Sequence, residues 1–497
     1  MIDAKTLSYD YDEEALGFEE PPVADDTGPT ALEKVCLALA GAGVLGFLVQ
    51  VFGVGPAAGW VGTWTGLIAG FALPCAAASV YFILSYKDTT PGIKNNGAYF
   101  SGLMSRGGPG WLAGIVMTGF YILLYWFPAT LEGAIRMTDP LALALSGSAA
   151  NQWFLYGFLY TLAVCTFGVR MIMRYRHNRY QQIRTVSVMF FQLGFAFLIP
   201  HILRMLNQPE FYFSYFWPLK YDYLFPGTVS YIVNSPGGLG VFFIFWGAVM
   251  TFVATPLLTY KFGKRWYCSW VCGCGGLAET MGDPWRQLSD KSTKAWKIER
   301  WMVHLVLVFV TVTTLLLWAN SATGGWVFGG ISHTFSRWYG FFIGAVFSGV
   351  IGVGFYPIMG TRVWCRFGCP MAAILGIFQR FLSKFRITTN GGQCMSCGNC
   401  STYCEMGIDV RAYAQKGENI IRASCVGCGV CAAVCPRGVL KLENGATFAD
   451  RYKGAENPFG ALIEAVKRDN TSGIFERPTK AEAVRFVKGM RDMRVRG

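Results

Sequence analysis

Long apolar runs, separated by shorter polar stretches, fill most of the chain up to residue 360. Eight of these runs lie at 35–54, 64–85, 110–128, 152–173, 186–206, 237–259, 301–319 and 339–359. A run of about 20 apolar residues can cross a bilayer as a helix, and a helix satisfies its own backbone hydrogen bonds there. The pattern predicts an all-α polytopic membrane protein with about eight transmembrane helices.

The remaining polar stretches divide the chain into further parts. Residues 1–34 hold ten acidic residues against two lysines, which predicts an acidic, disordered tail. The membrane domain covers 35–385 and ends in a stretch, 371–385, typical of an amphipathic helix at the membrane surface. A compact cysteine-rich module follows at 386–445, and a C-terminal tail occupies 446–497.

Basic residues gather in alternate loops, at 174–184, at 261–300 and after 359. Because Lys and Arg favour cytoplasmic loops, both termini and the cysteine-rich module are expected on the cytoplasmic side of a bacterial inner membrane. The net charge of +13 therefore reflects membrane topology rather than nucleic-acid binding. The first apolar run follows an acidic start, so we expect it to be a retained anchor and not a secretory signal.

The cysteine-rich module contains two runs with the spacing C-x2-C-x2-C-x3-C. They are Cys394, Cys397, Cys400 and Cys404, then Cys425, Cys428, Cys431 and Cys435. In a two-cluster ferredoxin the fourth cysteine of each run binds the other cluster. The expected [4Fe–4S] ligand sets are thus Cys394, Cys397, Cys400 and Cys435 for one cluster, and Cys404, Cys425, Cys428 and Cys431 for the other.

This spacing favours an α+β bacterial ferredoxin-like fold over a zinc site, because zinc sites use paired C-x2-C motifs. The chain has 16 cysteines, and most fall into metal-ligand spacings, which points to reduced thiols rather than disulfides. Glu405 stands where many ferredoxins have proline after the fourth cysteine, so the local geometry there is expected to differ.

Two further cysteine motifs follow the sixth and eighth apolar runs. They are Cys268-x3-Cys272, with Cys274 just beyond, and Cys365-x3-Cys369. The spacing places both sulfurs of a motif on one face of a helical turn, and the topology brings both motifs to one side of the membrane. Three interpretations stay open: a third metal centre, of iron–sulfur type; a dithiol or single-metal site for redox or copper chemistry; or cysteines kept for packing.

Over 237–440 this arrangement resembles the membrane polyferredoxins of the NosR, NapH and CcoG type, a 4Fe–4S binding superfamily. The resemblance implies electron transfer in nitrous-oxide reduction or in the quinol-oxidising branch of nitrate reduction, or a role in maturing a copper-containing oxidase. The chain departs from the family pattern in having Gly273 in place of proline, an added Cys274, and four apolar runs before residue 180.

The four histidines offer few ligands for other cofactors. His304 begins the seventh run on the side of the cysteines and is a candidate quinone or proton site. His201, with Arg204, lies near the opposite end of the fifth run. At 1.5 Å per residue the two histidines differ in depth by about 20 Å, which excludes a haem shared between them.

The sequence thus predicts a membrane-bound iron–sulfur protein. It would relay electrons between cytoplasmic-side [4Fe–4S] clusters and a membrane quinone or partner redox subunits, as a subunit of a larger respiratory complex. The alternative is an accessory copper reductase or assembly factor for another metalloenzyme. No catalytic residue is predicted. One gap remains, because nothing visible carries an electron across about 30 Å of hydrocarbon.

Overall fold

The computed structural model describes residues 29–51, 59–87, 107–208, 211–381, 383, 385–389 and 394–444. The predicted acidic tail up to residue 28 and the C-terminal tail from 445 lie outside the described residues.

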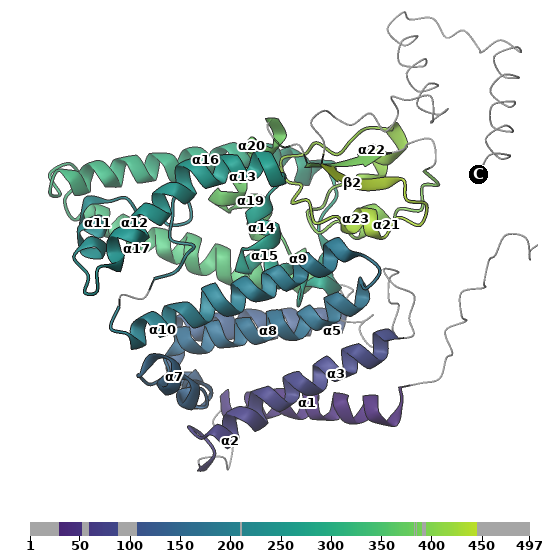
Figure 1. Cartoon of the computed structure of the whole chain (residues 1–497), viewed down its shortest axis with the longest axis horizontal. Helices are drawn as coiled ribbons and strands as arrows, with labels where there is room; N and C mark the ends of the chain where they lie inside the picture. Colours follow the sequence, from purple (N-terminus) through teal and green to yellow (C-terminus); the bar gives the residue numbers. More distant parts are fainter. Residues whose placement is uncertain are drawn as a thin grey trace, which may run out of the picture.

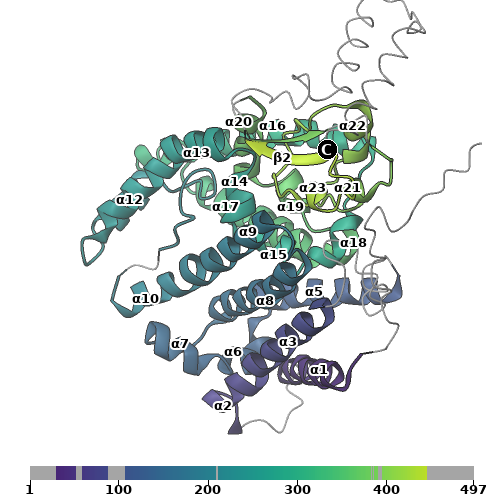
Figure 2. The same ribbon diagram turned by 45° about the vertical axis from the view of Figure 1, so that its right-hand side comes forward.

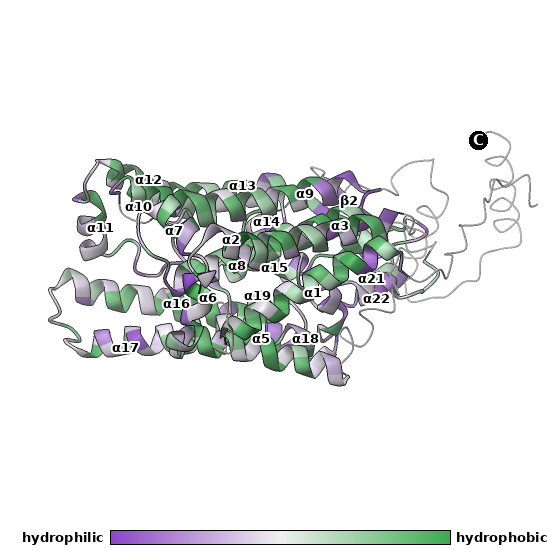
Figure 3. Ribbon diagram, turned by 90° about the horizontal axis from the view of Figure 1, so that it is seen from below, coloured by the Kyte–Doolittle hydropathy of each residue, from purple (hydrophilic) through white to green (hydrophobic). Residues whose placement is uncertain are grey.

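Eight helices in the described part are long and apolar enough to cross a membrane, and they confirm the eight predicted spans. The first four are α1 (Ala31–Val51), α2–η4–α3 (Trp64–Leu67, Ile68–Ala72, Leu73–Lys87), α5 (Gly108–Trp126) and α8 (Gln152–Arg174). The others are α9–η7–α10 (Arg179–Phe190, Phe191–Leu198, Ile199–Met205), α12–η8–α13 (Leu239–Val249, Met250–Ala254, Thr255–Phe262), α16 (Thr293–Ala322) and α17–η10 (Ile331–Tyr339, Gly340–Gly354). They lie roughly side by side, with apolar residues along most of their length (Figure 3).

Some helices extend beyond their apolar runs. Helix α16 begins at Thr293, before the predicted start at 301, and Ser292 caps it by accepting a hydrogen bond from the Ala295 amide at 3.2 Å. Its first turns are polar and carry Lys294 and Lys297. Because hydropathy marks only the apolar part of a helix, polar turns at its end escape prediction.

The cysteine-rich module sits at one end of the bundle, which we call the ferredoxin end (Figure 1). It consists of β1 (Phe385–Thr389), α21 (Asn399–Thr402), α22 (Val410–Lys416), α23 (Val430–Ala433) and β2 (Leu440–Asn444). The two strands are antiparallel, from Phe385 opposite Asn444 to Thr389 opposite Leu440. Helices α7 (Asp139–Ser146) and α11 (Pro226–Val233) mark the opposite or far end.

Two segments turn back into the bundle after reaching the ferredoxin end. The first contains α14 (Trp266–Trp270), α15 (Gly273–Glu279) and η9 (Asp283–Leu288), and the second contains α18 (Tyr356–Met359), α19 (Val363–Phe367) and α20 (Pro370–Phe381). In Figures 1 and 2, α14, α15 and α19 lie among the long helices. Irregular backbone at this depth is tolerated because surrounding protein covers it.

Helix α20 is not the surface helix that its amphipathic sequence predicts. It packs against α13 and α16, and Met371 and Leu375 are fully buried. They belong to a core cluster that also contains Tyr267 of α14 and Ile408 and Ile420 of the ferredoxin module. The apolar face of α20 is therefore covered by protein, and the module shares one hydrophobic core with the membrane helices.

Candidate iron–sulfur centres

The structure gathers the ferredoxin cysteines into two neighbouring groups. Cys394, Cys397, Cys400 and Cys435 line one pocket. The pKa of Cys400 is raised to about 12, mainly by burial and also by the thiols of Cys435, Cys397 and Cys394. The fourth thiol thus comes from the second cysteine run, as crossed ligation requires.

In the second group, the Cys431 thiol interacts electrostatically with Cys428, Cys425 and Cys404, and also with Cys400 of the first group. The two groups therefore adjoin. The pKa of Cys404 is raised to about 11, because burial raises it more than the Ile408 amide, which donates to its sulfur at 3.4 Å, lowers it. An amide aimed at sulfur is a typical means of tuning the potential of a cluster.

Two glycines shape the cysteine loops of the module. Gly398 and Gly429 follow the second cysteine of each run, with φ of +81° and +72°, and each precedes a short helix, α21 or α23. Glycine adopts this left-handed conformation without steric cost. Each loop can therefore fold back over its own thiols.

The two C-x3-C motifs are copies of one structural unit, Gly-x-Arg-x-x-Cys-x3-Cys, at 263–272 and 360–369; we call them the C-x3-C loops. In both, a glycine with positive φ ends a helix, Gly263 at +69° and Gly360 at +86°. The arginines are exchanged between the loops. Arg265 donates to the Cys365 carbonyl at 2.8 Å, and Arg362 donates to the Cys268 carbonyl at 3.3 Å.

This exchange brings together the four thiols that the motifs have in common. The Cys268 thiol interacts electrostatically with Cys369, Cys272 and Cys365. Cys274 stands outside the repeated unit and hydrogen bonds through its thiol to Cys272. In the described part of the chain, no three Cys, His, Asp or Glu side chains converge closely enough for a single metal ion. A cubane holds its thiolates farther apart, because each binds a different iron.

The first C-x3-C loop reaches deeper, at its end, than the expected position at the end of a span. A Cβ at Gly273 would lie 2.7 Å from Gln192 Oε1 and 3.5 Å from Tyr160 Cε1. Both neighbours are about 20 Å from the ferredoxin ends of their helices, at 1.5 Å per residue. The second loop also turns inward, since the Trp364 ring packs on Phe347 of η10 at 5.3 Å.

A buried network of ion pairs connects the first C-x3-C segment, the second C-x3-C loop and the ferredoxin module. Arg362 Nη2 lies 2.7 Å from Glu279 and 2.9 Å from Glu405. Arg286 lies 2.7 Å from Asp283 and 3.8 Å from Glu405. Arg184 also pairs with Glu279, and Arg170 and Arg174 with Asp283. Glu405, the residue in place of proline, thus anchors the module.

The charge around the thiols fits negatively charged clusters. The network contains five arginines and three acids, all buried, and Lys264 and Arg265 are buried with no acidic partner among the described residues. Uncompensated buried cations are costly. A cubane bound by four thiolates carries net negative charge and would offset them, and the thiols present are the ligands such a cluster takes.

A cavity of about 840 Å³ begins at Cys272, Gly273 and Cys274 and extends between α8 and η7–α10 toward the far end. Tyr160, Gln192 and His201 line it. The candidate His304 does not; its side chain is exposed on α16. Gln192 escaped the sequence analysis, although a glutamine within an apolar run was a signal that could have singled it out.

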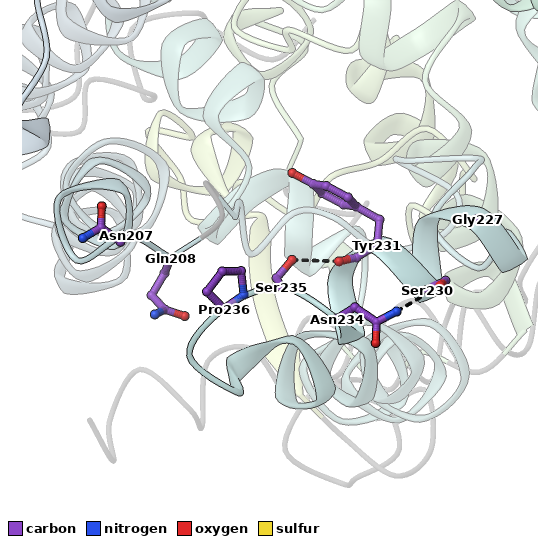
Figure 4. A pocket seen from close by; sticks show the side chains of 8 residues that line it. All are labelled: Asn207, Gln208, Gly227, Ser230, Tyr231, Asn234, Ser235 and Pro236. Carbon is purple, nitrogen blue, oxygen red and sulfur yellow. Dashed lines mark hydrogen bonds between the residues drawn. The ribbon is translucent and has the colours of Figure 1, made fainter.

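A second pocket, of about 700 Å³, lies at the far end between the end of α10 and α11 (Figure 4). Most of the residues that line it have polar side chains, and the Ser235 hydroxyl donates to the Tyr231 carbonyl at 2.8 Å. None of the eight residues that line it is a cysteine or histidine. This pocket is therefore separate from the thiol groups.

Comparisons with known families agree with this geometry. A 4Fe–4S dicluster domain matches residues 393–440, and a 4Fe–4S binding domain matches twice, at 243–292 and 339–388. The double match covers the two C-x3-C loops and reveals a duplication that the sequence analysis missed. Fold and site together define a multi-pass membrane protein with 4Fe–4S binding domains.

The chain is also similar in sequence to three curated proteins. The chain is 26% identical over 189 residues to YccM, a candidate electron transport protein of Escherichia coli (strain K12). It is 28% identical over 185 residues to the regulatory protein NosR of Stutzerimonas stutzeri, and 29% over 162 to the methylamine utilization ferredoxin-type protein MauN of Paracoccus denitrificans (strain Pd 1222). It is a 4Fe–4S ferredoxin-type membrane protein related to these three.

The matched region is a third of this chain and covers 46%, 23% and 55% of YccM, NosR and MauN, in that order. The chain thus spans about half the length, or less, of the curated relatives it matches. No solved structure matches the chain.

Proposed function

We propose that this protein carries electrons along three iron–sulfur centres, between the cytoplasmic side and a membrane quinone or partner redox subunits. The observation that carries the proposal is the convergence of Cys268, Cys272, Cys365 and Cys369 inside the bundle, next to the ferredoxin module. A third group of thiols there extends the chain of centres into the membrane layer.

The proposed ligand sets follow the thiol groups. Cys394, Cys397, Cys400 and Cys435 hold one [4Fe–4S] cluster, and Cys404, Cys425, Cys428 and Cys431 hold the second. Cys268, Cys272, Cys365 and Cys369 hold the third. Clusters of this kind supply one-electron transfer.

The surrounding side chains fix the positions of the centres and influence their potentials. Arg362 contacts the Cys365 sulfur at 3.8 Å as well as Glu405, so it joins the third group to the module. Buried positive charge and hydrogen bonds to sulfur stabilise the reduced, more negative form of a cluster and raise its potential. The basic loops support a cytoplasmic ferredoxin end.

Iron and acid-labile sulfide, counted in anaerobically purified full chain, test the proposal. We expect about twelve irons per chain, from three cubanes, and about eight when Cys268, Cys272, Cys365 and Cys369 are changed to serine. Cys75→Ser with Cys165→Ser is the matched control, because these thiols lie in α3 and α8 away from the three groups, and it should keep all the iron. A wild-type count of eight would refute the third centre.

The copper-handling alternative has one observation in its favour. The Cys272 and Cys274 thiols hydrogen bond to each other and line a cavity, and soft paired thiolates suit Cu(I). Protein without iron at the C-x3-C loops allows a test of this role. Stoichiometric Cu(I) binding by the wild type would support it, provided that the binding disappears in Cys272→Ser and also in Cys274→Ser.

A further inference from the structure

The cavity at the C-x3-C loops reaches from the thiols to the far end of the bundle. On α8 its lining runs from the cap residue Asn151 to Tyr160, and on η7–α10 from Gln192 to Arg204. These stretches are about 14 and 18 Å long at 1.5 Å per residue. The volume of about 840 Å³ lies within the range of about 300–1,000 Å³ typical of small-molecule sites.

The lining combines aromatic rings with hydrogen-bonding groups and lacks acids. Tyr156, Tyr160 and Tyr267 interact electrostatically with the Cys274 thiol, and Gln192 lines the cavity from η7. The Tyr160 hydroxyl is buried and has no hydrogen-bond partner among the described residues. The charged lining residues are Arg204 and Lys220. Such a surface suits a flat, uncharged ring with oxygen atoms that accept or donate hydrogen bonds.

We propose that this cavity is the binding site of a quinone, with its ring in the part of the cavity that Tyr160, Gln192 and Cys272 line. The inference rests on the proposed function and locates its quinone partner. A lipid-soluble carrier is the natural occupant, because the cavity lies among the membrane helices. The site is on the far side of the C-x3-C loops from the ferredoxin module.

The reaction balances with the centres already proposed. Quinol oxidation breaks two O–H bonds and releases two electrons and two protons. The electrons would pass one at a time to the iron–sulfur centres that the thiols of this chain are proposed to hold, and these centres together could accept both. The protons would leave through the cavity toward the far end, past His201 and Arg204, which line it. Quinone reduction takes the same steps in reverse.

Gly273 opens this site. A Cβ there would collide with Gln192, at 2.7 Å, while the equivalent position of the second loop is Pro370. Because Gly273 has no side chain, the cavity extends as far as Cys272 and Cys274. The difference between the two loops thus fits the lining of this cavity, which includes the first loop and not the second.

Filling the cavity tests the proposal. Gly157 lines it, and a Cβ at Gly157 would meet only the Phe197 ring, at ordinary contact distance of 3.5 Å, so Gly157→Leu should fold. We expect binding of decylubiquinone to the full chain, measured by extraction from washed protein, to weaken by about tenfold or more. The rate at which decylubiquinol bleaches the clusters should fall by a similar factor, while the rate of their reduction by dithionite should be unchanged.

Gly194→Leu is the matched control, because Gly194 lies on η7 outside the cavity with no atom near its Cβ position. It should bind quinone within about twofold of the wild type. If Gly157→Leu fails to fold, Ala196→Leu fills the same cavity. Unchanged binding in the filled variants would place the quinone elsewhere and overturn the inference, while leaving the proposed function intact.

A photoreactive quinone provides a measurement that needs no variant. We expect labelled peptides from 152–174 and 191–205. Labelling confined to 302–310 and 367–370, which line a separate cavity of about 250 Å³ against the second loop, would also overturn the location. A wild-type protein that neither binds decylubiquinone nor is bleached by decylubiquinol would instead remove quinone from the proposed function.

Discussion

Glu405 shows how one residue joins two parts of this protein. It follows Cys404 in the ferredoxin module, yet its carboxylate is 1% exposed and accepts a hydrogen bond from Arg362 at 2.9 Å. Arg286 adds a longer ion pair at 3.8 Å. The sequence marked Glu405 as a departure from ferredoxins, but only the fold shows which cations face it.

Removing the Glu405 charge should loosen the module. Glu405→Gln keeps the size of the side chain but leaves two buried arginines undercompensated, and breaking a buried pair in this way costs about 3–5 kcal/mol. We expect a lower thermal midpoint for loss of the cluster absorbance. Glu418→Gln, an exposed carboxylate in the same module, should leave the midpoint unchanged. Equal midpoints for both variants would mean that the apolar core alone holds the module.

Asp283 gives a prediction with a defined pH dependence. Burial raises the pKa of its carboxyl, but Arg174, Arg286 and Arg170 lower it, and the net pKa is well below the ordinary value. A carboxyl with a depressed pKa stabilises the fold fully above its unfolded pKa of about 3.9, and this contribution is lost as the pH falls toward the folded pKa.

The loss of stability in Asp283→Asn should therefore be constant between about pH 8 and 5, well above the unfolded pKa. It should shrink only below about pH 4. Thermal unfolding, followed by tryptophan fluorescence at several pH values, measures it. A difference that already declines between pH 8 and 6 would show that Asp283 is not held as a carboxylate by these arginines.

At the scale of elements, the two C-x3-C loops act as one duplicated unit. Each loop ends a helix at a glycine with positive φ, and each arginine reaches the other loop. Cys274 has no counterpart, because the equivalent residue of the second loop is Met371. The pseudo-symmetry thus separates four ligands from one additional thiol.

This asymmetry predicts opposite results for neighbouring cysteines. Cys272→Ala should remove about four irons per chain, the content of one cubane, whereas Cys274→Ala should keep them, because Cys274 lies outside the repeated unit. Both variants have the same change in volume, so each controls for the other. Iron loss in Cys274→Ala alone would reassign the ligand set.

The elements also show how far sequence reasoning reaches. The eight spans and the ferredoxin-like module follow from local patterns, because apolar length and cysteine spacing are properties of short segments. The depth of the C-x3-C loops does not, since it depends on contacts between distant residues such as Gly273 and Gln192. The interior position of α20 cannot be predicted from its sequence for the same reason. The sequence is amphipathic, but α13 and α16 pack against the helix.

On the scale of the whole molecule, the depth that the first C-x3-C loop reaches in the bundle shortens the distance that electrons must cross. With all centres at one edge, about 30 Å of hydrocarbon separated them from the opposite side. The first C-x3-C loop reaches about 20 Å into the bundle at Gly273, and the cavity continues from there to the far end. The proposed centres and quinone site therefore form a continuous route across the bilayer, and its direction depends on which end faces the cytoplasm.

Labelling from outside the cell determines that orientation. Asn234 is exposed at the far end after α11, and Lys416 is exposed in the ferredoxin module. If the basic loops are cytoplasmic, a membrane-impermeant maleimide should label Asn234→Cys in intact spheroplasts and Lys416→Cys only after lysis, with the wild type as background. The reverse pattern would place the ferredoxin end outside. The predicted orientation would put quinol protons outside and electrons inside, so that quinol oxidation by this protein would add to the membrane potential.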